Sequence, residues 1–233
     1  MGRVLKIGHR GAAGYAPENT LASVEHAIAH GVDFVEVDVQ RTKDEHLVIL
    51  HDKRVDRTTN GTGLISEMSL CALRELDAGA GQRIPTVEEV LRTANERVGL
   101  ILELKIKGIA EQVRKSVHLS GFTGQVIYAS FKHDELPALR EADPQAMTMA
   151  LFGWSPHNAV MTTQKAKATH IGFSHRTLTK SLIEISHQRG LVVIVYTVND
   201  QRDIQSVMSL GVDGIVSDFP DRLSAAFFAQ RAS

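Results

Sequence analysis

The sequence contains only one cysteine, Cys71, so no disulfide can form within the chain. The absence of cysteine pairs is typical of a reducing compartment, and the simplest interpretation is a cytoplasmic protein. Cys71 lies beside Leu70 and close to Leu73 in the sequence. We therefore expect its side chain to be packed among apolar residues.

An excess of charge of one sign is also missing. The chain has 26 basic and 27 acidic residues, for a formal net charge of −1. A nucleic-acid phosphodiesterase normally carries a basic surface, so this class is disfavoured. No stretch reaches about 18 uninterrupted apolar residues, so we expect no membrane span. The first twenty residues lack the apolar core of a secretory leader. No pattern indicates an oligomeric state.

Short apolar segments alternate with amphipathic stretches along all 233 residues. The expected strands are 4–9, 34–39, 99–104, 125–130, 146–151, 170–174, 191–198 and 213–218. The expected helices are 17–31, 86–97, 109–121, 133–143, 177–190 and 200–211, with a final helix at 227–233. Nearly continuous apolar strands are typical of a parallel sheet buried on both faces. About eight strand–helix units predict an α/β fold, a TIM (β/α)8 barrel forming one domain over residues 1–233. A doubly wound open sheet would need fewer strands.

Residues 41–85 interrupt this alternation and predict a small inserted cap between the second strand and the second helix. The segment VILHD, 48–52, follows the second strand too closely for a parallel crossover, which needs roughly a dozen residues. We therefore predict an antiparallel hairpin with Asp44 and Glu45 at its tip. In that register Asp38 faces His51, so the turn returns an imidazole toward the acidic residues of the preceding strand.

Acidic residues lie at the ends of two expected strands. Glu36 and Asp38 are two residues apart, so they project from the same face. Buried carboxylates this close repel each other unless a cation neutralises them or one stays protonated. Glu103 ends another strand, with Lys105 on the same face, and the C-terminal strand ends of a barrel meet at one mouth. Three carboxylates there suit Mg²⁺ or Ca²⁺ better than Zn²⁺, and structural ion pairs are the alternative.

The first strand ends in the motif GHRG. The imidazole of His9 titrates near neutral pH and suits proton transfer, and the planar guanidinium of Arg10 matches phosphate oxygens. Such a histidine is often only a hydrogen-bonded core residue, and its position at the same mouth as the acidic residues favours a functional role. Asn19 either orders this mouth or caps the first helix, and Asn199 has the same two interpretations.

Several motifs, taken in order, resemble the glycerophosphodiester phosphodiesterase family. They are HRGAAGYAPENT, FVEVDVQRTKDEHLVILHD, RTTNGTG, LELK, YASF, VYTVND and GVDGIVSDFP, and they cover nearly the whole chain. The resemblance implies a TIM-barrel enzyme that hydrolyses small-molecule glycerophosphodiesters to glycerol 3-phosphate and an alcohol. It also implies one divalent cation, Mg²⁺ or Ca²⁺, held by Glu36, Asp38 and Glu103.

The same resemblance implies roles for four more residues. His9 and His51 would form the acid–base pair, and Arg10 and Lys105 would contact the phosphate. From a resemblance to related barrel phosphodiesterases we expect the glycerol 2-hydroxyl to be the first nucleophile, giving a cyclic phosphate that water then opens. The residues themselves do not decide between this route and direct attack by water.

The sequence departs from the family pattern at three positions. Glu45 replaces the usual glycine of the hairpin tip, Tyr196 replaces a common tryptophan, and Ser217 replaces a frequent threonine. None is a proposed ligand or proton carrier, so the departures bear on specificity. Two alternative functions stay open: a barrel phosphodiesterase of the lysophospholipase D type, which an exposed apolar rim would favour, and a non-catalytic phosphate-binding barrel.

Overall fold

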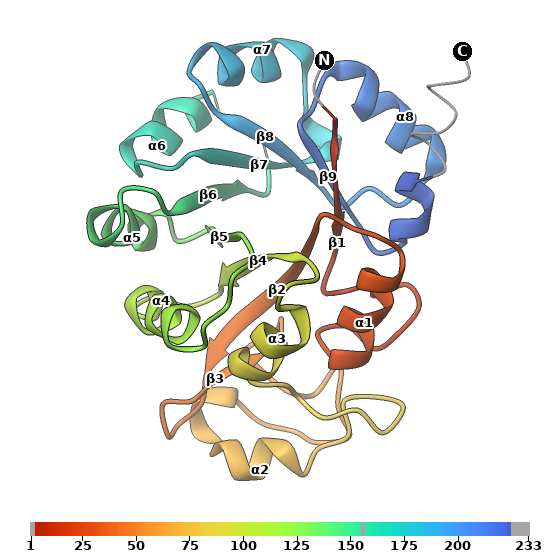
Figure 1. The fold of residues 1–233 in the computed structure, drawn as a ribbon, viewed down its shortest axis with the longest axis vertical. Coiled ribbons are helices and arrows are strands. Elements are labelled where there is room, and N and C mark those ends of the chain that lie inside the picture. The colour runs from red at the N-terminus through yellow and green to blue at the C-terminus, as the bar shows by residue number, and fades with distance from the viewer. Residues whose placement is uncertain (1–2, 155–156, 225–233) are drawn as a thin grey trace.

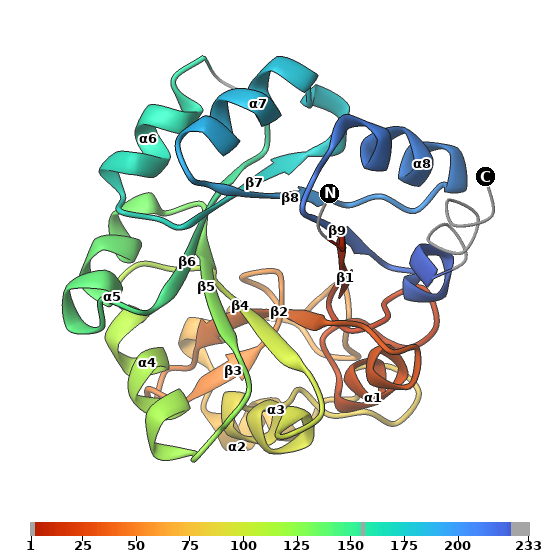
Figure 2. The ribbon, with the colours of Figure 1, turned by 45° about the horizontal axis from the view of Figure 1, so that its top comes forward.

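A closed barrel of eight parallel strands forms the centre of the protein (Figures 1 and 2). The computed structural model describes residues 3–154 and 157–224. The barrel strands are β1 (Leu5–Gly8), β2 (Phe34–Arg41), β4 (Gly99–Leu104), β5 (Val126–Ser130), β6 (Met147–Phe152), β7 (His170–Ser174), β8 (Val192–Tyr196) and β9 (Gly214–Ser217). Each pairs in parallel with its neighbours, and β1 closes the ring by pairing with both β9 and β2. The predicted TIM barrel is confirmed.

Helices surround the barrel, as Figure 2 shows. They are α1 (Leu21–Ala29), α3 (Val87–Ala94), α4 (Ala110–Leu119), α5 (Leu136–Ala142), α6 (Ala159–Lys165), α7 (Lys180–Gln188) and α8 (Gln201–Leu210). Single 3₁₀ turns lie at His133–Glu135 and His175–Thr177. The sequence reasoning missed α6, and the helix it predicted at 227–233 lies outside the described residues. No helix within the described ranges is long and apolar enough to cross a membrane.

Side chains alternate between the two faces of each strand, and they form one apolar layer outside the barrel and another inside it. Val35, Val37 and Val39 of β2 pack in the large core between the strands and the helices. The intervening positions face the barrel interior, where Phe34 joins a smaller cluster with inward residues of β1, β4, β5, β6, β8 and β9. Glu36 and Asp38 continue this inward face toward the C-terminal end of β2, because side chains alternate with a period of two.

The segment between β2 and α3 carries its own small core. It contains β3 (Leu47–Ile49), a 3₁₀ turn at Ile65–Glu67 and α2 (Leu70–Arg74), at the bottom of Figure 1. Its buried residues are Val48, Leu50, Val55, Ile65, Leu73, Ala78 and Ile84. Leu73 faces this core, whereas Cys71 lies on the exposed side of α2. The expectation that Cys71 is packed was therefore wrong, because residues two apart on a helix point in different directions.

The hairpin of β2 and β3 forms, but one residue out of the predicted register. Val39 pairs with Ile49, so the partner of Asp38 is Leu50, whose N–H donates to the Asp38 carbonyl at 3.0 Å. A three-residue turn, 43–45, replaces the expected two-residue tip, and Glu45 adopts a positive φ of 65°. This is the left-handed conformation that favours glycine, the residue usual there in the family.

The first helix begins later than predicted. Pro17 lies in the loop before the helix, and α1 starts at Leu21 after Thr20, whose hydroxyl accepts a hydrogen bond from the Ser23 N–H at 3.2 Å. Thr20 is therefore the N-cap. Asn19 is left free for another role, described below.

Candidate active site

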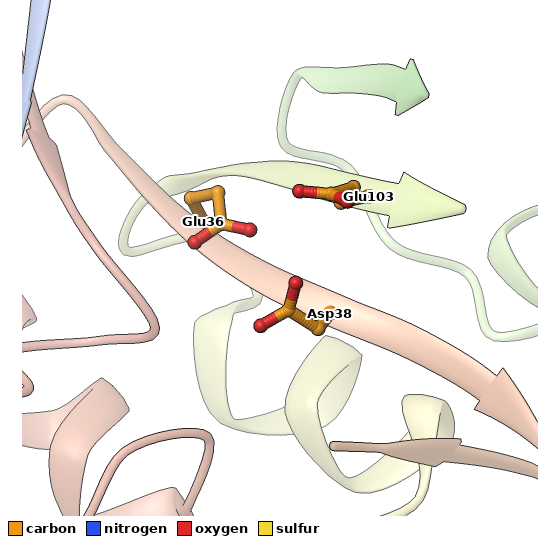
Figure 3. Close-up of side chains that lie close together, drawn as sticks. All are labelled: Glu36, Asp38 and Glu103. Atoms are coloured by element: carbon orange, nitrogen blue, oxygen red, sulfur yellow. The ribbon is translucent and has the colours of Figure 1, made fainter. Parts of the chain in front are cut away.

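Three buried carboxylates meet at the C-terminal end of β2 and β4 (Figure 3). Asp38 and Glu103 are direct partners in the pairing of these parallel strands, and Glu36 precedes Asp38 by two residues on the same face. One oxygen from each carboxylate lies within 4.8 Å of the others. The structure thus brings together the three residues that the sequence reasoning selected as metal ligands.

Glu36 lacks a cationic side-chain partner. Within residues 3–154 and 157–224 it makes no ion pair, and one of its oxygens accepts a hydrogen bond from the backbone N–H of Arg10 at 2.9 Å. Burial and the negative charge of Asp38 raise the pKa of Glu36 to about 8. Burial and the charge of Asp38 also raise the pKa of Glu103. If all three carboxylates were ionised, the cluster would therefore carry more negative charge than its surroundings neutralise.

Asp38 is the most tightly held of the three carboxylates. The Asn19 amide donates to it at 2.7 Å, and the Asn19 carbonyl oxygen accepts from the Asp38 N–H at 3.2 Å. Lys105 Nζ lies 3.2 Å from Asp38 and 2.7 Å from Glu103. Burial opposes ionisation, but the charges of Lys105 and Arg10 hold the pKa of Asp38 below its ordinary value. Asn19 therefore orders the mouth and does not cap the helix.

Arg10 lies beside the carboxylates and reaches across the mouth. Its Nε is 3.4 Å from Asp38, and this buried nitrogen has no hydrogen-bond partner among the described residues. Its Nη1 donates to Glu18 at 2.7 Å. Arg10 and Lys105 thus place two positive charges next to the acidic cluster, where an anionic group could contact both.

His9 is anchored by the last strand of the barrel. Its Nδ1 lies 2.6 Å from Asp218, which directly follows β9. Asn199 donates to the other oxygen of Asp218 at 2.6 Å and itself accepts from the Ser217 hydroxyl at 3.0 Å. Burial disfavours the charged ring, but the hydrogen bond to Asp218 and the charge of Glu36 outweigh it and raise the pKa of His9.

His51 is anchored within the inserted segment. Its Nδ1 lies 2.6 Å from Asp52, which accepts in turn from Arg57 Nε at 2.7 Å. Burial, together with the charges of Lys105 and Arg10, lowers the pKa of His51 more than the nearby carboxylates raise it. The two histidines therefore have pKa values displaced in opposite directions.

Gln40 fixes the backbone that carries His51. This buried residue lies two positions after Asp38 on β2, and its amide donates to the carbonyls of Leu50 and His51 at 3.1 Å each. It also contacts the Asp52 carbonyl. The same face of β2 thus supplies two carboxylates and the support for the neighbouring loop.

Two of the carboxylates line a cavity of about 40 Å³, with Glu36 and Glu103 joined by His9 and Tyr196 in its wall. The Tyr196 hydroxyl donates to the Phe152 carbonyl at 2.7 Å, and its ring meets that of Phe131 edge-on with centroids 6.2 Å apart. Ser217 keeps a hydroxyl hydrogen bond that a threonine could also make. The departures from the family pattern thus leave the polar contacts of the mouth in place.

The sequence reasoning missed the partners of the two histidines. Asp218 comes two residues after the inward-facing Val216, just as His9 follows Ile7. This spacing of two residues indicated that both side chains face the mouth. It did not indicate that they meet, because β1 and β9 lie at opposite ends of the sequence. Asp52 and Arg57 gave no such signal, because they lie in irregular turns.

Several known proteins that resemble this chain in sequence or in structure are named as phosphodiesterases. The sequence model of the glycerophosphoryl diester phosphodiesterase family matches residues 9–222. The protein YhdW of Bacillus subtilis (strain 168) is 38% identical, with 92% of this chain and 94% of that protein covered. A glycerophosphodiester phosphodiesterase of Caldanaerobacter subterraneus is 33% identical, covering 95% and 96%. An Oleispira antarctica phosphodiesterase, solved with its product sn-glycerol-3-phosphate, superposes with a TM-score of 0.89 at 28% identity, covering 95% of this chain and 96% of that one.

Proposed function

Because the chain belongs to the glycerophosphoryl diester phosphodiesterase family, whose named members are hydrolases, we propose that it cleaves glycerophosphodiesters to glycerol 3-phosphate and an alcohol. One observation carries the proposal. Three buried carboxylates, two cations and two histidines with oppositely displaced pKa values lie at one barrel mouth. The Oleispira antarctica relative, which holds sn-glycerol-3-phosphate, supports this product class.

The residues present fit one divalent cation, Mg²⁺ or Ca²⁺, on Glu36, Asp38 and Glu103. The donors are all carboxylate oxygens, which these hard cations prefer. Glu36 supports the assignment, because a buried acid without a cationic partner needs an added positive charge to ionise near neutral pH. When bound, such an ion stabilises negative charge on a phosphate oxygen.

Arg10 and Lys105 bind the phosphate in this proposal. Both are largely buried, and both already face the carboxylate cluster. A phosphodiester would give the unpartnered Arg10 Nε an acceptor. The two side chains share the charge that develops as the phosphorus–oxygen bond breaks.

The two histidines divide proton transfer between them. His51, with its lowered pKa, is neutral near pH 7 and removes the proton from the attacking hydroxyl. The raised pKa of His9 favours its protonated ring, which gives its proton to the leaving alkoxide. With the glycerol 2-hydroxyl as nucleophile, a cyclic phosphate forms as the alcohol leaves, and water then opens it with the proton transfers reversed.

An assay of glycerol 3-phosphate release from glycerophosphocholine, glycerophosphoethanolamine, glycerophosphoglycerol and glycerophosphoinositol tests the proposal. We expect turnover that EDTA abolishes and that Mg²⁺ or Ca²⁺ restores. Phosphorus NMR during the reaction reports whether a cyclic phosphate accumulates. Full activity in EDTA, or no turnover of any substrate with either ion, would refute the proposed reaction.

One observation favours a second candidate, hydrolysis of lysophospholipids. Phe131 and Trp154 follow β5 and β6 at the mouth, and they are 42% and 69% exposed. Exposed aromatic rings at a mouth can contact an acyl chain. Faster release of choline from lysophosphatidylcholine than from glycerophosphocholine would establish this activity. A non-catalytic barrel is disfavoured, because both histidines are present and ordered by carboxylates.

A further inference from the structure

Arg57 joins the inserted segment to the mouth of the barrel. Its Nε donates to Asp52 at 2.7 Å, and its Nη1 and Nη2 each donate to Glu18 at 2.8 Å. Nη2 also lies 3.3 Å from the second Asp52 oxygen. The planar guanidinium thus grips one carboxylate along each of two edges, a geometry that fixes orientation as well as distance.

Asp52, which Arg57 holds in place, also contacts His51. One Asp52 oxygen lies 2.6 Å from His51 Nδ1, so a fixed carboxylate fixes both the ring orientation and the nitrogen that carries the proton. The His51 side chain is one-third exposed and lies on the loop after β3. Neighbouring side chains therefore hold this ring less tightly than a core position would.

The other end of the link lies on the substrate side of the mouth. Glu18 accepts from Arg10 at 2.7 Å as well as from Arg57. The chain of contacts therefore runs from His51 through Asp52, Arg57 and Glu18 to a residue that we place at the phosphate. It crosses from the insertion, which carries His51, to the loop before α1.

We propose that Arg57 is a positioning residue, which holds His51 ready for proton transfer by clamping Asp52 against Glu18. The inference rests on the proposed function for its catalytic consequence, but not for the clamp itself. Stability alone does not account for the arrangement, because Arg57 is 48% exposed and exposed ion pairs contribute little to folding.

Arg54 provides a matched control. It lies three residues earlier in the same segment and also donates twice to one carboxylate, that of Asp56, at 2.9 and 3.2 Å. That ion pair is exposed, and neither partner contacts Glu18, Asp52 or His51. Arg54→Gln therefore removes an equivalent charge and ion pair without touching the proposed clamp.

The kinetic test compares Arg57→Gln, Arg57→Lys and Arg54→Gln on glycerophosphocholine. We expect kcat to fall about 10- to 100-fold in Arg57→Gln, the usual range for residues that orient a functional group. Arg57→Lys recovers only part of the loss, because an ammonium cannot grip two carboxylates in one plane. Arg54→Gln keeps wild-type kcat. An Arg57→Gln enzyme within twofold of wild type, or equal losses in Arg57→Gln and Arg54→Gln, would overturn the proposal.

A second measurement does not depend on activity. The His51 imidazole proton shared with Asp52 gives a downfield proton NMR resonance, which His51→Gln identifies by its loss. We expect Arg57→Gln to shift or broaden this resonance and Arg54→Gln to leave it unchanged. An unchanged resonance in Arg57→Gln contradicts the clamp even if wild-type protein proves inactive. If Arg57→Gln fails to fold, Glu18→Gln removes the charge and one of the two acceptor oxygens that Arg57 contacts, and it should move the same resonance.

Discussion

His9 and His51 lie at the same mouth but are held by different parts of the molecule. His9 follows β1 and bonds Asp218 at the end of β9, so two adjacent barrel strands fix it. His51 follows β3 in the inserted segment and bonds its sequence neighbour Asp52. The His9 side chain is the more buried of the two, because it is 20% exposed whereas the His51 side chain is 33% exposed.

The two histidines also differ in the protonation state that their surroundings favour. Next to His9, Glu36 and Asp218 stabilise the imidazolium ion. Around His51, burial together with the positive charges of Lys105 and Arg10 outweighs the nearby carboxylates. Two rings with the same chemistry thus come to favour opposite protonation states because of what surrounds them.

The strongest test of this comparison removes each ring in turn. We expect His9→Ala and His51→Ala to fold and to lose about 10²- to 10⁴-fold in turnover, the range for general acids and bases. A glycerol 3-phosphate ester of p-nitrophenol should rescue His9→Ala much more than His51→Ala, because p-nitrophenolate leaves without a proton. Turnover of glycerophosphocholine and of this ester measures both effects. Equal rescue of the two variants would contradict the assignment of acid and base.

A second test shifts the pH dependence of kcat/KM. The acidic limb should report His51, which must be neutral, and the alkaline limb His9, which must be protonated. Asp218→Asn removes contributions that raise the pKa of His9, so the alkaline limb moves to lower pH and the profile narrows.

Asp52→Asn removes a hydrogen bond that raises the pKa of His51, so the acidic limb moves to lower pH and the profile widens. Both variants should also lose about 10- to 100-fold at their optimum. Asp56→Asn, in the same segment as Asp52, serves as the control. If a limb of the kcat/KM profile stays in place or moves in the opposite direction, that limb does not report the assigned histidine.

The smallest effect concerns Gln40, the β2 residue whose amide supports the backbone at His51. Gln40→Met keeps the approximate shape of the side chain but removes the donor to the buried Leu50 carbonyl and the half-buried His51 carbonyl. We expect a loss of about 1–3 kcal/mol in the free energy of unfolding, measured by denaturant titration. Gln112→Met is the control, because its exposed amide donates to the Glu45 carbonyl at 2.6 Å. A loss in Gln40→Met no larger than in this control would mean that Gln40 is dispensable.

The strands of the barrel could be predicted because their apolar runs are long and local. All eight predicted segments correspond to barrel strands, and the inward spacing of Glu36 and Asp38 follows directly from strand geometry. Helix α6 was missed, and its seven residues give a short pattern. The hairpin register was wrong by one residue, because Glu45 adopts a conformation that is rare for its residue type.

The supporting contacts of the site could not be predicted in the same way. Asp218 pairs with His9 across 209 positions of sequence, and Asn19 reaches Asp38 from a different loop. Such contacts depend on how the barrel closes, and the pattern of apolar residues fixes the face of a strand without naming its distant neighbours. The roles of His9, His51, Arg10 and Lys105 stay predictions until the variants are measured.

The closure of the ring by β1 and β9 also sets an order of events during synthesis. Among the strands of the described residues, β1 is the first to leave the ribosome and β9 is the last, yet the hydrogen-bond partner of His9 follows β9. A nascent chain that stops short of residue 214 lacks β9 in its barrel wall and lacks Asp218, the hydrogen-bond partner of His9. The hydrogen bond between His9 and Asp218 can therefore form only after the three carboxylates and His51 have all been translated.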